Sequence, residues 1–330
     1  MTVSPEPLPE AKRAVQGYIR GLAVGSQRTV AQSLDVVAKV LTTDTKADRF
    51  RIAWHQLGAS AVHGLREALA KGYMPATVNK MLSCVRGVLT TCHRMELMTD
   101  AQHEAAAVPN VPMIYHPEPA DVGMVGDEEV GALLNVCARA ATPGNLRDAA
   151  LLAILLNTGL RRAEAIALDR ADYRVLRSGS EIVAATLLIR GLISAHHREV
   201  VLAARSIELI EPWLAVRGDQ PGPLLLPVNK SGVISHRRLT DQAIYDIIRR
   251  LAVRAHLPHI TTRGIRRSYV ASLIASGLPV EEVAPLCGHA SWLTTESYQN
   301  LAREIAGRPL KLLRQFAPPQ EKPSKRKKGA

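Results

Sequence analysis

The amino-acid sequence predicts a mainly α-helical protein with one small antiparallel β-sheet, divided into a helical N-terminal domain and a mixed α/β second domain. Three observations predict this fold class. Apolar residues recur at helical spacing through most of the 330 residues. Prolines interrupt that pattern between residues 106 and 124. Two short segments, residues 181–190 and 199–203, are rich in Ile, Val and Leu and bracket a polar turn, which is typical of a β-hairpin.

These changes in composition predict five segments. Residues 1–10 hold three prolines and little apolar surface, and we expect a flexible arm there. A helical domain at 11–105 and a proline-stiffened linker at 106–124 follow. The second domain is expected at 125–317. The basic residues among prolines and glycine at 318–330 predict a disordered tail.

Helical periodicity is clear at residues 75–94 of the first domain, where Lys80, Arg86 and Arg94 lie among the non-apolar positions. By the pattern alone, those cations would form a solvated basic face. In the second domain, residues 146–156 are almost wholly apolar, which predicts a buried helix that stops at residues 157–159. Further helices are expected at 204–216 and 241–255, after the hairpin.

The helix predicted at residues 262–276 has Arg263 and Arg266 on one face of its first turn. Backbone N–H groups at a helix N-terminus already attract an anion, and a phosphate suits this arrangement. After Pro279 a second helix is expected to end near Gly288. A third helix, with Thr294 or Thr295 as its cap, is expected to contain Tyr298.

The composition limits the classes of function. A formal net charge of +12 favours a polyanionic partner. No Walker loop or dinucleotide fingerprint is present, so we expect no nucleotide cofactor. No signal peptide and no apolar run of membrane-spanning length occur, which predicts a cytoplasmic protein. The cysteines show no CxxC spacing and lie in apolar helical patterns, which favours buried free thiols over disulfides or zinc: Cys84, Cys92, Cys137 and Cys287.

Several of these residues together resemble the motifs of the tyrosine recombinase (phage integrase) family. Thr158, Gly159, Leu160 and Arg161 match its Thr-Gly-Leu-Arg box, with Glu164 at the usual place. Arg266 matches the arginine of a His-x-x-Arg box, and His289 the histidine of a Gly-His pair. Tyr298, nine residues later, matches the nucleophilic tyrosine. The match covers roughly residues 20–316 and implies a helical core-binding domain, which contacts DNA, followed by the family's catalytic domain.

Two positions depart from the family's pattern. Arg263 stands where the family has the histidine of His-x-x-Arg. The lysine that the family keeps on the hairpin is missing, because no lysine occurs between Lys80 and Lys230. By register its place falls at residues 192–193. The polar residues nearby are Arg190, His196, His197 and Arg198, and the candidates to replace the lysine as general acid are Arg190, His196 and His197.

The resemblance implies a reaction at a DNA phosphodiester. Tyr298 would be the nucleophile, and the other catalytic residues would be Arg161, Arg263, Arg266 and His289. In-line attack places extra negative charge on the non-bridging oxygens, which permanently charged guanidinium groups stabilise without a metal. The covalent 3′-phosphotyrosine intermediate conserves the energy of the broken phosphodiester bond. The strand can therefore be rejoined without ATP or another cofactor.

The implied partner is double-stranded DNA, held by Lys80, Arg86 and Arg94 and by the tail residues Lys325, Arg326, Lys327 and Lys328. The implied assembly is a homo- or hetero-tetramer of recombinases on two DNA sites, associated with the nucleoid. Its role would be DNA integration, transposition of a mobile element or chromosome resolution. The two departures favour an alternative, a recombinase-derived DNA-binding protein with impaired or lost cleavage. A relaxing type IB topoisomerase shares the chemistry and is a third possibility.

Overall fold

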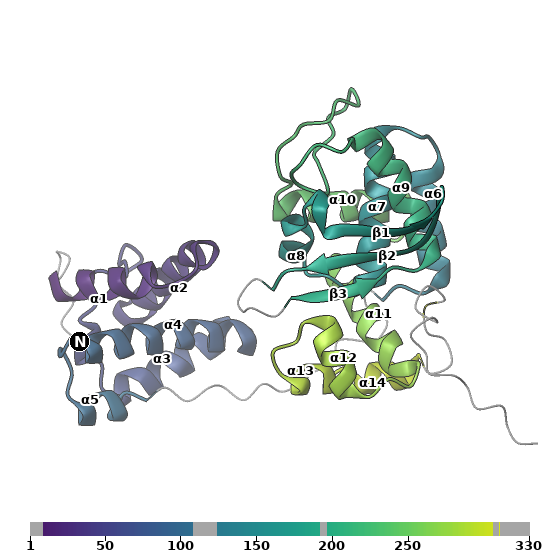
Figure 1. Cartoon of the computed structure of the whole chain (residues 1–330). Helices are drawn as coiled ribbons and strands as arrows, with labels where there is room; N and C mark the ends of the chain where they lie inside the picture. The colour runs from purple at the N-terminus through teal and green to yellow at the C-terminus, as the bar shows by residue number, and fades with distance from the viewer. Residues whose placement is uncertain (1–8, 108–123, 192–196, 306–309, 311–330) are drawn as a thin grey trace, which may run out of the picture. The chain divides into compact units, whose positions relative to one another are not determined.

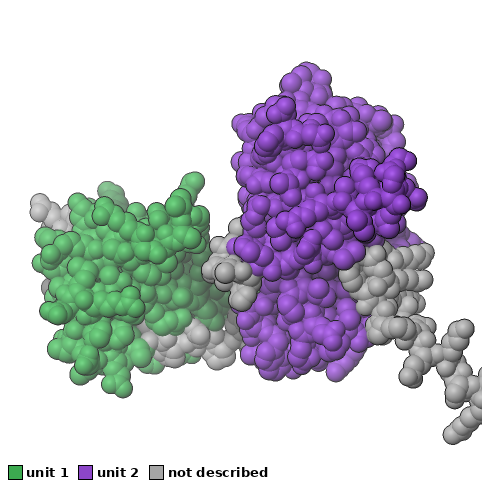
Figure 2. Space-filling view, viewed as in Figure 1, with its two compact units in different colours: residues 1–116 green, residues 117–330 purple. Residues whose placement is uncertain are grey.

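The computed structural model describes residues 9–107, 124–191, 197–305 and 310. The chain divides into two compact units, residues 1–116 and 117–330, which Figure 2 shows in separate colours. The described elements are α-helices with one three-stranded antiparallel sheet, which confirms the predicted fold class. The division falls inside the proline-rich stretch 106–124, of which residues 108–123 lie outside the described part, as do residues 1–8 and the tail from 318.

The first unit is wholly helical in its described part and packs around α4 (Pro75–Arg94), whose bounds equal those predicted. Gly87 lets α1 approach α4 closely, because a Cβ at this position would lie 2.2 Å from the Tyr18 ring. Lys80 and Arg94 are exposed on α4. The other helices are α1 (Pro9–Arg20), α2 (Val24–Thr42), the 3₁₀ turn η1 (Trp54–Gln56), α3 (Ala59–Gly72) and α5 (Asp100–Ala105).

The start of α1 corrects one predicted boundary. We expected a flexible arm over residues 1–10, but the helix already begins at Pro9. Proline fits the first turn of a helix because the N–H that it lacks has no intrahelical acceptor there. The prolines at the N-terminus therefore do not all indicate an irregular segment.

The second unit is built around α7 (Pro143–Thr158), which is buried from Arg147 onward and packs against α6, α9 and α11. A helix that is apolar all round is stable only when it is covered on all sides, as its sequence predicted. Figure 1 shows the remaining elements of this unit. They are α6 (Asp127–Ala138), α8 (Arg162–Ala167), η2 (Arg170–Asp172), β1 (Tyr173–Ser178), β2 (Glu181–Ile189), β3 (Arg198–Val201), α9 (Ala204–Arg217), α10 (Asp241–Arg254), α11 (Thr262–Ala275), α12 (Val280–Cys287), α13 (Trp292–Glu296) and α14 (Gln299–Glu304).

Asn157 ties the end of α7 to the sheet and to α9. Its side-chain N–H donates to the carbonyl of Val201 at 3.1 Å, and its side-chain oxygen accepts from the backbone N–H of Ala203 at 2.8 Å and from the Ser206 hydroxyl at 3.1 Å. The side chain is fully buried. These bonds hold the C-terminus of α7 rigidly, and the residues that follow it enter the candidate site.

The sheet has the strand order β1-β2-β3, and β1 was not predicted. Opposite residues of an antiparallel pair have side chains on the same face. Arg198 pairs with Ile189, and Val200 with Leu187. Because Ile189, Leu187 and Val200 are buried, this register places Arg198 on the inner face of the sheet. Figure 1 shows α12 on the side of the sheet that ends with β3, and this helix contacts that strand.

Two further expectations concern the cysteines and membranes. All four cysteines are free and buried, as predicted. Burial raises the pKa of Cys92 to about 11 and those of Cys137 and Cys287 to about 12, so these thiols stay protonated and unreactive at neutral pH. Among the described helices, none combines the length and the apolar character that crossing a membrane requires.

Candidate active site

The carboxylate of Glu164, on α8, lies at the centre of the candidate site and is 4% exposed. Arg198 donates to both of its oxygens, at 3.1 and 3.2 Å, and Arg161 Nη1 to one of them at 3.3 Å. Arg266 lies 4.0 Å away. Burial raises the pKa of Glu164, but the hydrogen bonds from Arg198 and the Arg161 backbone, with the charges of both arginines, lower it overall. One carboxylate among three guanidinium groups leaves an excess of positive charge.

The first motif brings Arg161 into this cluster through a glycine turn. Gly159 ends α7 with φ +58°, a left-handed conformation, and a Cβ at this position would lie 2.3 Å from the Tyr269 ring. Arg161 then occupies the N-cap of α8, and its backbone N–H donates to Glu164 at 2.8 Å. The backbone of Arg161 is thereby fixed, while its side chain remains 45% exposed and accessible to a ligand.

Arg266 links α11 to the ends of two other helices. Its Nη1 donates to the carbonyl of Gly159 at 2.7 Å, and its Nη2 to the carbonyl of Cys287 at 2.7 Å. The side chain is only 11% exposed. Burial, and secondly the charge of Arg161, lower its pKa from the ordinary arginine value. Arg266 is therefore held by backbone carbonyls next to a like charge, which an anion between the two would stabilise.

His289 follows the turn that ends α12. Its Nδ1 shares a hydrogen bond of 2.7 Å with the hydroxyl of Thr295, which is fully buried. Burial lowers the pKa of His289 to about 4, with further lowering by the charges of Arg266, Arg161 and Arg198 against a raising effect of Glu164. The imidazole is thus neutral at pH 7. Since Thr295 occupies Nδ1, Nε2 is the nitrogen that remains for a substrate.

Tyr298 lies beside His289, with ring centroids 6.0 Å apart and an angle of 14° between the ring planes. Our expectation of a helix capped by Thr294 or Thr295 that contains Tyr298 was wrong. A short helix, α13, already begins at Trp292, so Thr295 lies inside it and binds His289. Tyr298 is the N-cap residue of the next helix, α14. The tyrosine thus lies at a helix junction, where it also packs against the small apolar cluster of Ala271, Leu301 and Ala302.

Arg263 lies in the first turn of α11 and is exposed. Within the described part of the chain we find no hydrogen bond or ion pair of its guanidinium group. The cap of this helix comes from Thr261, whose hydroxyl accepts from the backbone N–H of Gly264 at 3.0 Å. Among the described residues Arg263 is therefore an uncommitted cation, three residues from Arg266, whose side chain is 11% exposed.

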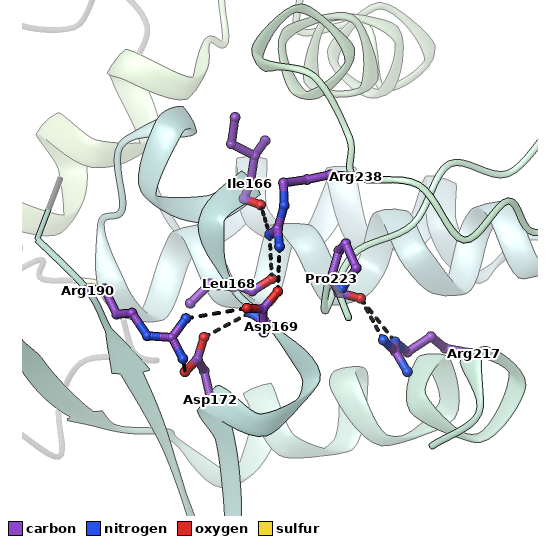
Figure 3. A network of polar contacts seen from close by, with 8 residues as sticks. All are labelled: Ile166, Leu168, Asp169, Asp172, Arg190, Arg217, Pro223 and Arg238. Atoms are coloured by element: carbon purple, nitrogen blue, oxygen red, sulfur yellow. Dashed lines mark hydrogen bonds and ion pairs between the residues drawn. The ribbon is translucent and has the colours of Figure 1, made fainter. Parts of the chain in front are cut away.

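Arg190, a candidate general acid, belongs to a separate network that Figure 3 shows. Its guanidinium pairs with Asp172 at 2.5 Å and with Asp169 at 3.4 Å, and Arg238 binds the same Asp169 at 2.6 Å. These ion pairs give Arg190 a structural role. Of the other two candidates, His197 is exposed next to β3, and His196 lies outside the described residues.

Sequence reasoning did not assign two side chains that the structure places in the cluster. Arg198 was named only as a polar neighbour, because its inward direction depends on the pairing register of β2 and β3. Thr295 was expected to cap a helix and instead binds His289. Glu164, recognised as part of the first motif, is the residue that connects the arginines.

This chain is similar to known proteins over most of its length. The model of the Phage integrase family matches residues 124–304, more than half of the chain. The tyrosine recombinase XerC of Vibrio parahaemolyticus is 28% identical over 287 residues, covering 86% of this chain and 84% of that protein. The tyrosine recombinase XerD of Yersinia pestis is 28% identical over 246 residues, covering 73% of this chain and 76% of that protein.

Solved structures share the fold. The XerH site-specific recombinase, in a post-cleavage complex with a palindromic difH substrate, superposes with a TM-score of 0.61 at 20% identity, covering 90% of this chain and 83% of that chain. A lambda integrase dimer bound to a COC′ core site also gives 0.61, at 12% identity, covering 89% of this chain and 95% of that chain. The family match over residues 124–304 includes every residue of the arginine, histidine and tyrosine cluster. This chain therefore belongs to the phage integrase family.

Proposed function

We propose that the protein is a site-specific DNA recombinase that cuts and rejoins DNA through a covalent 3′-phosphotyrosine at Tyr298. The observation that carries this proposal is the cluster of positive charge beside that tyrosine. Arg161 donates to the carbonyl of Gly288 at 3.0 Å across 127 residues of sequence, which brings the first motif against the Gly-His turn. Tyr298 stacks on His289 of that same turn.

The geometry supports a division of labour among these side chains. Arg161 and Arg266 supply fixed donors for the non-bridging oxygens of a scissile phosphate, and their positions are set before DNA binds. His289, neutral at pH 7, offers Nε2 either to a phosphate oxygen or to the proton of the attacking tyrosine. Arg263, exposed and uncommitted, supplies a further cation where the family has a histidine.

We propose double-stranded DNA as the partner, in a tetramer that joins two sites in the bacterial cytoplasm. XerH is bound to a difH substrate, and lambda integrase forms a tetramer on a Holliday junction. In this chain, Lys80, Arg86 and Arg94 of α4 and the cations of the tail would contact phosphates. A net charge of +12 supports that assignment.

A second function has its own supporting observation. The leaving 5′ oxygen is strongly basic unless it is protonated, and the hairpin has no lysine to protonate it. A protein that binds recombination sites without cutting them would tolerate that loss. The intact cluster around Glu164 and the position of Tyr298 favour the active enzyme, with His196 or His197 as the acid.

Covalent trapping tests the proposed function. The parental protein is incubated with nicked suicide duplexes that carry its genomic binding site, and adducts are separated on a denaturing gel. We expect a DNA-linked band for the parent and none for Tyr298→Phe, although both proteins bind the duplex. Equal adduct in both proteins would exclude Tyr298 as the nucleophile. Binding without any adduct would support the non-cutting alternative.

A further inference from the structure

We propose that Arg198 is a positioning residue of this site, which holds the Glu164 carboxylate and thereby fixes Arg161 and Arg266 for phosphate binding. The inference rests on the proposed function, since it assigns a role within the same site. Arg198 comes from β3, whereas Arg161 is the N-cap of α8 and Arg266 belongs to α11. It therefore attaches the cluster to the sheet.

The contact between Arg198 and Glu164 is bidentate. Two parallel hydrogen bonds, at 3.1 and 3.2 Å, join the planar guanidinium to both carboxylate oxygens, and the two side chains are 12% and 4% exposed. Such a pair defines the orientation of the carboxylate as well as its position. The other arginine side chains approach Glu164 less closely, at 3.3 and 4.0 Å. Arg198 is thus the side chain that sets the direction of Glu164.

A second contact connects Arg198 to Arg161. The Nη1 atom of Arg198 lies against Gly288, where a Cβ would be only 2.6 Å away. The carbonyl of Gly288 accepts the 3.0 Å hydrogen bond from Arg161. Arg198 therefore contacts both groups that hold the Arg161 side chain, Glu164 and Gly288. Loss of Arg198 would leave a space beside the Gly288 turn, and among the described residues the carboxylate would keep only its hydrogen bonds from Arg161.

The charge of Arg198 also acts on His289. The charged and titratable groups that face His289 are Arg266 from α11, Arg161 and Glu164 from the first motif and α8, Arg198 from β3, and Tyr298 from the C-terminal segment. The nearby charge of Arg198 is one of the causes that lower the pKa of His289. Removing that charge should raise the pKa of His289, which provides a readout that does not depend on cleavage.

The first test measures single-turnover cleavage at saturating suicide duplex for Arg198→Gln, Arg198→Lys, Glu164→Gln and the double variant Glu164→Gln/Arg198→Gln. Displacing a catalytic group by about an ångström costs about a hundredfold in rate, and we expect a loss of that size for Arg198→Gln. Arg198→Lys keeps the charge and one hydrogen bond, so it should fold and lose less. The double variant should be no slower than the slower single variant, because the two residues act as a unit.

The matched control is Arg205→Gln, which breaks an exposed arginine–glutamate pair, Arg205–Glu208 at 2.7 Å, on α9. We expect it to cleave at the parental rate. Cleavage by Arg198→Gln at that same rate would overturn the proposal. A double variant that loses rate by the product of the two single-variant factors would also overturn the proposal, because the effects of independent residues combine in this way.

The second test is an NMR titration of His289 in the protein without DNA, with its signal assigned by comparison with His289→Asn. The pKa of His289 should rise in Arg198→Gln and stay unchanged in Arg205→Gln. An unchanged pKa of His289 in Arg198→Gln would show that Arg198 does not belong to the cluster. If the parental protein forms no covalent adduct, the proposed function fails, and this titration still decides the position of Arg198.

Discussion

The carbonyl oxygen of Gly159 accepts a hydrogen bond of 2.7 Å from Nη1 of Arg266, across 107 residues of sequence. A second bond joins Arg161 to the carbonyl of Gly288 at 3.0 Å. Each glycine has a positive φ, and the carbonyl of each turn accepts a hydrogen bond from an arginine of another motif. These bonds connect three motifs: the first box, the Arg266 box and the Gly-His pair.

This relationship makes Gly159 a sensitive position. Gly159→Ala would place a Cβ 2.3 Å from the Tyr269 ring and force alanine into a left-handed conformation. We expect the free energy of unfolding to fall by about 2–4 kcal/mol, measured by urea denaturation, and cleavage to fall with it. Gly131→Ala on α6 is the matched control, because nothing lies within 4 Å of its added Cβ. It should raise stability by about 0.5–1 kcal/mol. Parental stability of Gly159→Ala would contradict the packing described here.

Arg263 should affect chemistry without affecting stability. It is exposed and has no polar contact within the described residues, so Arg263→Ala should change the free energy of unfolding by less than about 0.5 kcal/mol. The same change should severely reduce cleavage of the suicide duplex, because we propose Arg263 as a further cation of the phosphate site. Arg263→His should retain part of the activity if Arg263 occupies the place of the His-x-x-Arg histidine, as we propose. An Arg263→Ala protein that cleaves at the parental rate would exclude Arg263 from the site.

The proposed absence of the family's hairpin lysine leads to a prediction about the general acid. Replacing the leaving 5′ oxygen of the DNA by sulfur removes the need for a proton. If His196 or His197 is the acid, its replacement by Ala should abolish cleavage of normal DNA and spare the sulfur substrate. A histidine suits this task better than an arginine, which rarely gives up its proton.

Arg190 supplies the comparison for that experiment. Its ion pairs with Asp169 and Asp172 predict that Arg190→Gln lowers stability, and that any loss of cleavage is equal on the two substrates. Selective rescue of Arg190→Gln by the sulfur substrate would instead identify Arg190 as the acid.

The basic tail should contribute affinity that does not depend on DNA sequence. Residues 318–330 contain five cations, and their deletion should weaken binding to cognate and random duplexes alike. The logarithm of the binding constant falls linearly with the logarithm of the salt concentration, and each lost phosphate contact makes this slope shallower by about 0.9. A tail of the same length with each lysine and arginine replaced by glutamine is the control for length. An unchanged slope in both variants would mean that the tail does not touch DNA.

Strong periodicity made much of the fold predictable. Helices α4, α9 and α10 lie within a residue of their predicted bounds, because each has an apolar stripe and a clear stop. Strand β1 was missed because Arg174 and Arg177 interrupt any apolar alternation. Strand β3, which also lies at an edge of the sheet, was predicted from its apolar residues.

Side-chain direction was the part that sequence could not supply. Arg190 and Arg198 flank one hairpin turn, and the sequence analysis named Arg190 as a candidate general acid and Arg198 only as a polar neighbour. The register of β2 and β3 turns Arg198 toward Glu164, whereas Asp169 and Asp172 bind Arg190 elsewhere. Contacts between residues distant in the chain decide such cases, and a single sequence does not contain them.

The central claim is that Tyr298 becomes covalently joined to DNA, and identifying the modified peptide tests it most directly. The adduct formed on a suicide duplex is digested with protease and nuclease, and the nucleotide-bearing peptide is sequenced by mass spectrometry. We predict a 3′-phosphate ester on Tyr298 in the peptide that includes Trp292–Glu296. A nucleotide on any other residue, or a parental protein that binds its site without forming an adduct, would contradict the account.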